Sequence, residues 1–125
     1  TGVQTCALPI YQPEAMIIPD TYHMFLAGTG PNALGRLRGD FIAIFQFADA
    51  GKEVEPILHK GVDSQRVLPG DGKIDLKGYL TSLKKTGFDG CVSLELYNPE
   101  YRKREPVAFL EEALRKTVKV VASVG

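Results

Sequence analysis

The sequence predicts an α/β protein in which parallel strands are covered by helices. Three short apolar runs, residues 15–19, 41–47 and 91–96, each precede a segment with helical signals, so strand and helix alternate three times. The runs are almost continuously apolar, which is typical of strands buried on both faces of a parallel sheet. With 125 residues, 44% of them hydrophobic, the chain can bury one modest core.

The first unit consists of the strand at residues 15–19 and a short helix. Pro19 suits the end of a strand because it has no N–H group to donate to a neighbour. The turn "GTGPN" follows, and Pro31 is expected to open a helix that runs to Leu37.

The second unit begins with "FIAIFQF", residues 41–47, an apolar run broken only by Gln46. The polar segment that follows, residues 48–73, is long for a connection inside a compact domain, and such loops are usually functional or disordered. It contains Asp49, Asp63, Arg66 and the turn sequence "PGDG".

The two later helices show regular apolar spacing. Asp75 is expected to cap the helix of the second unit, which Gly87 ends, and Pro106 is expected to open the helix of the third. Each helix carries one apolar face. In the helix of the second unit this face consists of Leu76, Tyr79, Leu80 and Leu83. In the helix of the third unit it consists of Val107, Leu110, Leu114, Val118 and Val121.

Composition limits the partners that the protein is expected to have. Fifteen Lys and Arg balance fifteen Asp and Glu, so no basic footprint for nucleic acid is present. No apolar run approaches the ~20 residues of a membrane-spanning helix. Cys6 and Cys91 lie far apart, with Cys91 in a strand expected to be buried, so neither a disulfide framework nor a cysteine metal motif is indicated and a cytoplasmic location is the default.

Each apolar run ends on a polar side chain that can bind a cation or carry a proton, namely Asp20, Gln46 or Glu95. Because the ends of parallel strands meet on one face, these three oxygen donors are expected to converge. Such donors suit a divalent ion such as Mg²⁺ or Mn²⁺, which would also stabilise Glu95 among its apolar neighbours. The alternative is that each acid caps a helix or forms half of an ion pair.

Two further residues have both a structural and a functional interpretation. His23, three residues after Asp20, is either an ordinary loop or core histidine or a substrate contact. Arg66 is either a solvated surface cation or a clamp for an anionic or hydroxyl-rich substrate.

Four segments, "DTYHMF" (20–25), "FQFADA" (45–50), "RVLPGDGKID" (66–75) and "SLELY" (93–97), resemble elements of the xylose isomerase-like TIM barrels, the sugar phosphate isomerase/epimerase family. The resemblance implies that Asp20, Gln46 and Glu95 are metal ligands, with Gln46 where most members have His. It implies that Glu95 is also a catalytic acid/base and that His23 and Arg66 contact the substrate. The implied metal is Mn²⁺ or Mg²⁺, with Co²⁺ or Zn²⁺ as alternatives.

The resemblance also implies that residues 15–125 are the sixth to eighth units of a (β/α)₈ barrel, which normally needs ~250 residues. The family's other catalytic Glu, expected on the fifth strand, has no counterpart before residue 15. Residues 1–14 are expected to be a non-native or unstructured leader, since residues 1–10 resemble translated sequencing-adapter sequence. For the full-length protein, assembly into a homo-oligomer is left open.

The implied activity is isomerisation or epimerisation of a sugar, sugar phosphate or hydroxy-keto acid by proton transfer through an enediolate. One alternative is a dehydratase of the inosose or 3-dehydroshikimate type, and another is an inactive truncated or binding-only barrel. The AP endonucleases of the same superfamily are disfavoured because Gln46, Gln65 and Arg66 stand where the nuclease pattern has histidines.

Overall fold

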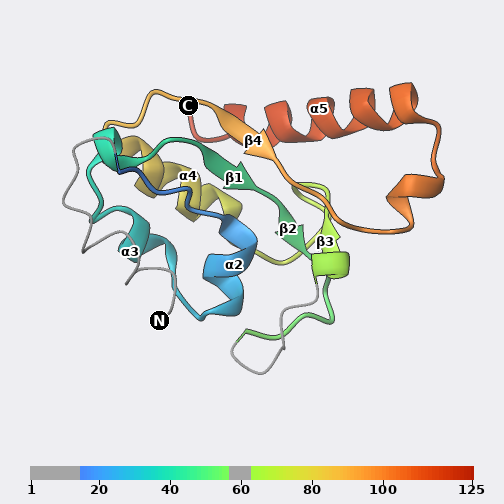
Figure 1. The fold of residues 1–125 in the computed structure, drawn as a ribbon, viewed down its shortest axis with the longest axis horizontal. Coiled ribbons are helices and arrows are strands. Elements are labelled where there is room, and N and C mark those ends of the chain that lie inside the picture. Colours follow the sequence, from blue (N-terminus) through green and yellow to red (C-terminus); the bar gives the residue numbers. More distant parts are fainter. Residues whose placement is uncertain (1–14, 57–62) are drawn as a thin grey trace.

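The computed structural model describes residues 15–56 and 63–125 (Figure 1). The expected leader, residues 1–14 with Cys6, lies outside this range, as does a piece of the long polar segment, residues 57–62. In the described ranges, no helix is both long and apolar enough to cross a membrane.

Three parallel segments lie side by side and form the centre of the fold. β1 (Phe45–Phe47) pairs in parallel with β4 (Val92–Leu94). Two isolated parallel bridges join residues 17–20 to the same segment of chain as β1, one from Ile17 to Ile42 just before β1 and one from Asp20 to Gln46 within it. α4 (Leu76–Lys85) lies behind β1, and α5 (Pro106–Ala122) lies beside β4 (Figure 1). The predicted alternation of parallel strands with helices is therefore confirmed.

The strands are shorter than the apolar runs that predicted them. Residues 15–19 form only bridges, and residues 39–41 turn into the 3₁₀ helix η1 (Gly39–Phe41) before β1 begins. The expectation that Cys91 is buried is wrong: it precedes β4 and is exposed. β4 pairs only with β1 within the described chain, which leaves its other edge open.

Two short helices follow the first parallel segment. α2 (Thr21–Leu26) was not predicted; Asp20 caps it, because Asp20 Oδ1 accepts the His23 N–H at 3.0 Å. α3 (Pro31–Leu34) begins at the expected proline but ends before Leu37. Six residues are too few for apolar periodicity to reveal a helix such as α2.

α4 (Leu76–Lys85) agrees with its prediction at both ends. Asp75 Oδ1 accepts the Gly78 N–H at 2.9 Å, and Gly87 takes a φ of +78° just after the helix. All four residues of its predicted apolar face are buried. They pack in a core with Phe45 and Phe47 of β1.

α5 (Pro106–Ala122) begins where it was predicted, with Glu105 as its cap. The five residues of its predicted apolar face are exposed by 37–65%, while Ala113, on another face, is buried. The prediction of one apolar face on this helix is correct, but the expectation that the face is covered is wrong for the residues that the structure describes. We call Val107, Leu110, Leu114, Val118 and Val121 the α5 stripe.

The sheet also has one covered and one open face. Phe45 and Phe47 point into the core and are fully buried, whereas Gln46 between them points the opposite way. The open face carries Met16, Ile18 and Ile44, which are among the exposed large apolar residues. Polar residues at the ends of the strands therefore project from the side that would become the interior of a closed barrel.

The polar segment after β1 is more ordered than predicted. It contains β2 (Asp49–Ala50), which pairs antiparallel with β3 (Arg66–Val67), and the 3₁₀ helix η2 (Asp63–Gln65) directly before β3. After β4 the chain forms a further 3₁₀ helix, η3 (Tyr101–Lys103). The β2 and β3 pair places Arg66 at the ends of the parallel segments.

Candidate active site

The strand register brings the three predicted metal ligands together. Asp20 forms a parallel bridge with Gln46, and Gln46 is the partner of Ser93, two residues before Glu95 on the same face. Gln46 Nε2 donates a hydrogen bond to Glu95 Oε1 at 2.8 Å. The predicted convergence of these side chains is present in the structure.

Arg66 lies in the middle of this cluster and is fully buried. Its Nη1 donates to Asp20 Oδ2 at 2.8 Å, and its Nη2 lies 3.2 Å from Asp63 Oδ1 and 3.4 Å from Glu95 Oε2. The guanidinium carbon also lies 4.6 Å from the centre of the Tyr22 ring. The interpretation of Arg66 as a solvated surface cation is therefore wrong.

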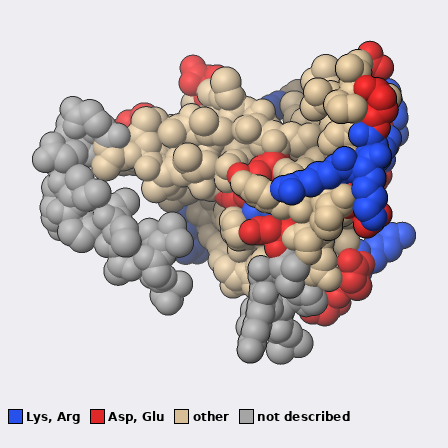
Figure 2. All heavy atoms as spheres, turned by 45° about the vertical axis from the view of Figure 1, so that its right-hand side comes forward, with Lys and Arg blue, Asp and Glu red and all other residues tan. Residues whose placement is uncertain are grey.

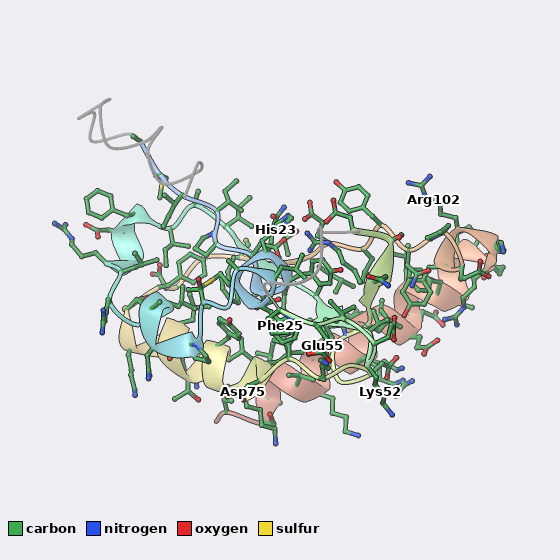
Figure 3. All side chains as sticks on the ribbon, turned by 90° about the horizontal axis from the view of Figure 1, so that it is seen from below. His23, Phe25, Lys52, Glu55, Asp75 and Arg102 are labelled. Atoms are coloured by element: carbon green, nitrogen blue, oxygen red, sulfur yellow. The ribbon has the colours of Figure 1, made fainter. Side chains whose placement is uncertain are left out.

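His23 lies beside Arg66 at the opening of the site. Its Nε2 is 3.0 Å from Arg66 Nη2 and 3.9 Å from Asp63 Oδ1, while 60% of the side chain is exposed. The label in Figure 3 places His23 on α2, on the opposite side of the view from Asp75. The two predicted substrate contacts, His23 and Arg66, thus lie together, one accessible and one buried.

Glu95 is partly buried and has partners. Burial is the main cause that raises the pKa of Glu95 above its usual range, and the nearby Asp20 carboxylate raises it further, while Arg66 and Gln46 act in the opposite direction. The Tyr97 hydroxyl lies 3.5 Å from Glu95 Oε1. In this structure the cation beside Glu95 is Arg66, so the carboxylate is not an isolated charge.

The donor set fits a divalent ion in part. Asp20, Gln46 and Glu95 offer carboxylate and carboxamide oxygens of the kind that Mg²⁺ and Mn²⁺ bind. Among the residues that the structure describes, no three His, Cys, Asp or Glu side chains are grouped closely enough to hold a metal ion. These three residues can therefore supply only a portion of a coordination sphere, and the remaining ligands would have to be water, substrate or side chains outside the described ranges.

Sequence reasoning assigned no role to several residues that hold the site together. Asn98 Nδ2 donates to the Arg66 carbonyl at 3.1 Å, and the Tyr101 hydroxyl accepts the Leu68 N–H at 3.2 Å. Asp49 accepts backbone N–H groups from the "PGDG" turn. Asp49 could have been singled out by its position two residues after the end of a buried strand, because functional polar residues gather at the ends of parallel strands.

Charges of both signs are mixed on the surface. On the face drawn in Figure 2, most of the visible Lys and Arg side chains lie on the right, with Asp and Glu side chains next to them. Several are paired: Lys73 with Glu55, Lys103 with Glu100, and Lys116 with both Asp71 and Glu112.

Comparison with protein families identifies the class. The model of the family described as "Xylose isomerase-like TIM barrel" matches residues 10–117. The chain belongs to this family, and its three parallel units are a part of the barrel, as the sequence resemblance predicted.

Individual relatives of the chain include isomerases and dehydratases. The chain is 36% identical over 106 residues to the inosose isomerase of Bacillus subtilis. The aligned segment covers 85% of this chain and 37% of the relative. The chain is 34% identical over 94 residues to the 3-dehydroshikimate dehydratase of Pseudomonas putida, covering 72% of this chain and 14% of the relative. A crystal structure of the IOLI protein with a binding zinc atom superposes with a TM-score of 0.86 at 30% identity, covering 97% of this chain and 42% of that one. The chain thus spans little more than a third of the inosose isomerase.

Proposed function

We propose that the protein containing this chain is a divalent-metal-dependent isomerase or epimerase acting on a sugar-like ketone or aldehyde. The observation that carries the proposal is the meeting of Asp20, Gln46 and Glu95 at the ends of three parallel segments, with Arg66 and His23 beside them. Similarity to an inosose isomerase supports a cyclic polyol-derived ketone as the substrate class.

Glu95 is the proposed proton carrier. Isomerisation or epimerisation next to a carbonyl removes a proton from one carbon, gives an enediolate or enolate, and returns a proton to the neighbouring carbon or to the other face of the same one. A carboxylate whose pKa is raised by burial accepts a proton more readily than an ordinary surface carboxylate, which favours its use as a general base. A second acid/base group would come from outside the described residues.

His23 is the proposed direct substrate contact, and the buried Arg66 guanidinium is the proposed cation beside the bound oxygen. The His23 ring is accessible, and its Nε2 lies 3.0 Å from the Arg66 guanidinium, so a hydroxyl or carbonyl oxygen held by His23 would lie close to a fixed positive charge. A preorganised cation of this kind stabilises negative charge as it develops on oxygen. Asp20 and Glu95 hold the guanidinium in place before substrate arrives.

Asp20, Gln46 and Glu95 would hold the metal ion. When bound, the ion would polarise the substrate carbonyl and hydroxyl oxygens. The oxygen donor set favours Mn²⁺ or Mg²⁺. The zinc atom in the IOLI structure keeps Zn²⁺ among the metals to test, together with Co²⁺.

A dehydratase is the second candidate, supported by similarity to a 3-dehydroshikimate dehydratase. Its first step would be the same removal of a proton next to a carbonyl by Glu95. The two candidates differ in the second step: the dehydratase expels a β-hydroxyl as water, whereas the isomerase returns a proton to carbon.

The experiment that tests both candidates follows hydrogen exchange with solvent. The protein at the full length of its relatives is incubated in D₂O with Mg²⁺, Mn²⁺, Zn²⁺ or Co²⁺ and a panel of inososes, ketoses and hydroxy-keto acids. The metal is then removed with a chelator and the products are examined by NMR. Metal-dependent deuterium at a carbon next to the carbonyl, without loss of water, is the expected result.

Two variants sharpen this experiment. Glu95→Gln keeps the size and hydrogen-bonding capacity of the side chain but removes the base, so exchange should fall at least about 100-fold, the lower end of what a general base contributes. Arg102→Gln, at an exposed position that Figure 3 shows far from His23, should retain full activity. An unsaturated product would move the assignment to the dehydratase, and near-normal exchange in Glu95→Gln would remove Glu95 from the mechanism.

A further inference from the structure

The Asp49 carboxylate is buried and accepts four backbone N–H hydrogen bonds. Its Oδ1 accepts from Ala50 and Ile74, each at 2.9 Å, and its Oδ2 accepts from Gly70 and Gly72, each at 3.0 Å. Only 1% of the residue is exposed. Three of the four donors belong to residues 68–74, which we call the Asp49 loop.

The sequence of this loop is explained by its approach to Asp49. Gly70 has a φ of +89°, a conformation that other residues rarely adopt. A Cβ atom at Gly72 would lie 2.4 Å from Asp49 Oδ1 and 2.1 Å from the Ala50 carbonyl oxygen. Glycine is required at both positions for the two N–H groups to reach the carboxylate, so "PGDG" encodes more than a turn.

The same contacts determine where Arg66 lies. In the antiparallel pair of β2 and β3, Asp49 is opposite Val67 and Ala50 is opposite Arg66. The Asp49 loop leaves β3 directly after Val67 and returns to β2, where the Lys73 N–H donates to the Ala50 carbonyl at 3.1 Å. Asp49 therefore joins the strand opposite Arg66 to the loop that follows Arg66.

A fixed backbone matters at Arg66 because its guanidinium has several simultaneous partners. The side chain must reach Asp20 at 2.8 Å and Glu95 at 3.4 Å while lying beside His23. A shift of about 1 Å in a positioned group can cost roughly 100-fold in rate. Small movements of β3 would lengthen these contacts.

We propose that Asp49 is a positioning residue for Arg66: by holding the Asp49 loop against β2, its carboxylate fixes the guanidinium between Asp20 and Glu95. The effect on turnover rests on the proposed function, in which Arg66 supplies positive charge beside the substrate oxygen held by His23. The effect on the position of Arg66 does not depend on that function and can be measured separately.

The test compares Asp49→Asn with Asp75→Asn in the protein at the full length of its relatives. In Asp49→Asn the new NH₂ group must face at least one pair of backbone N–H donors, so at least two of the four hydrogen bonds are lost. Asp75 is a matched control, since its carboxylate also accepts a backbone N–H but lies at the start of α4, away from His23 (Figure 3).

The first readout is the guanidinium Nη1–H resonance of Arg66, the group that donates to Asp20, in ¹⁵N-arginine-labelled protein, assigned by its loss in Arg66→Lys. We expect this resonance to move towards the position of solvent-exposed arginines, or to broaden, in Asp49→Asn and to stay unchanged in Asp75→Asn. An unchanged resonance in folded Asp49→Asn would overturn the proposal, since Asp49 would then serve only stability. If Asp49→Asn does not fold, Gly70→Ala replaces it in the test, because it strains the same loop and keeps the carboxylate. The resonance should move in the same direction in Gly70→Ala, and no movement would again overturn the proposal.

The second readout is metal-dependent deuterium exchange. At equal folded fraction, Asp49→Asn should lower kcat/KM about 10- to 100-fold, the usual loss when a supporting partner of a site residue is removed, chiefly by raising KM. Asp75→Asn should leave kcat/KM unchanged. If the unmodified protein shows no exchange, the proposed function fails, and the Arg66 resonance still decides whether Asp49 positions Arg66.

Discussion

Arg66 and Asp20 form a buried ion pair, with Arg66 Nη1 at 2.8 Å from Asp20 Oδ2 and both side chains at most 4% exposed. Removing two charges from water is costly, and a buried pair often contributes less to stability than apolar residues of the same size. Its presence among residues that converge at strand ends therefore favours a functional role. The pair also fixes the direction of the guanidinium towards Glu95 and His23.

Replacing Arg66 should be strongly destabilising. In Arg66→Met the Asp20 carboxylate would remain buried without its cation, and we expect the free energy of unfolding to fall by about 3–5 kcal/mol. The double variant Arg66→Met with Asp20→Asn should recover part of this loss, because the unpaired buried charge of Asp20 is removed. Urea unfolding of the single and double variants measures both effects.

Arg38 provides the control for this comparison. It is also paired with an aspartate, Asp40, but both side chains are more than 60% exposed. Arg38→Met should therefore leave the unfolding transition almost unchanged. A small effect for Arg66→Met, similar to that of Arg38→Met, would show that the buried pair is not required to neutralise Asp20.

Gly72→Ala should test the approach of the Asp49 loop. The added methyl group would lie 2.1 Å from the Ala50 carbonyl oxygen, so the loop must move away from β2. A loss of about 3 kcal/mol in the free energy of unfolding is expected, at the upper end of overpacking effects. Gly30→Ala is the control, since its added methyl would contact nothing within 4 Å and should change stability by less than about 0.5 kcal/mol. Equal effects of the two substitutions would contradict the close contact at Gly72.

The parts of the fold that follow from local rules could be predicted from the sequence. Asp75 and Pro106 mark helix starts because capping and the fixed φ of proline act within one turn. The meeting of Asp20, Gln46 and Glu95 followed from a topological rule, since parallel strands place their ends on one face.

The surroundings of Arg66 could not be predicted in the same way. Its burial depends on the pairing of β3 with β2 and on Asp20, which lies 46 residues earlier in the chain. Nothing in the spacing of polar residues within the 48–73 segment shows that a two-residue ladder forms there. The four N–H groups that meet Asp49 come from backbone geometry, which composition does not reveal.

Tyr79 should make stability fall at alkaline pH. Its hydroxyl donates to the Thr29 carbonyl, and burial raises the pKa of Tyr79 to about 12. Because the folded-state pKa is above the ordinary value near 10, the unfolded chain loses this proton first as pH rises. The stabilisation is therefore complete below about pH 10 and is lost as pH rises towards 12, with a total of roughly 2 kcal/mol.

Urea unfolding at pH 9 and pH 12 measures this difference. Tyr79→Phe should be less stable at pH 9, because it lacks the hydrogen bond to Thr29, and should lose less stability than the unmodified protein between the two pH values. Tyr97→Phe serves as the comparison, since Tyr97 is 48% exposed. If Tyr79→Phe and the unmodified protein lose the same free energy, titration of other groups accounts for the alkaline effect.

The α5 stripe should respond to substitution differently in chains of different length. In the 125-residue chain Leu114 is 65% exposed, so Leu114→Lys should leave the free energy of unfolding nearly unchanged and reduce self-association, measured by light scattering. Ala113→Lys is the control on the covered face; Ala113 is 2% exposed, and a lysine there should destabilise the chain.

The inosose isomerase of Bacillus subtilis is longer than this chain, which spans 37% of it, and closing a barrel would bring further helices and strands against α5. In a protein of that length we expect Leu114→Lys to destabilise by about 2 kcal/mol, the value of burying one leucine side chain. Urea unfolding of both lengths, with and without the substitution, measures the change. The same small effect at both lengths would mean that the α5 stripe stays exposed in the longer protein and that another element closes the barrel at β4.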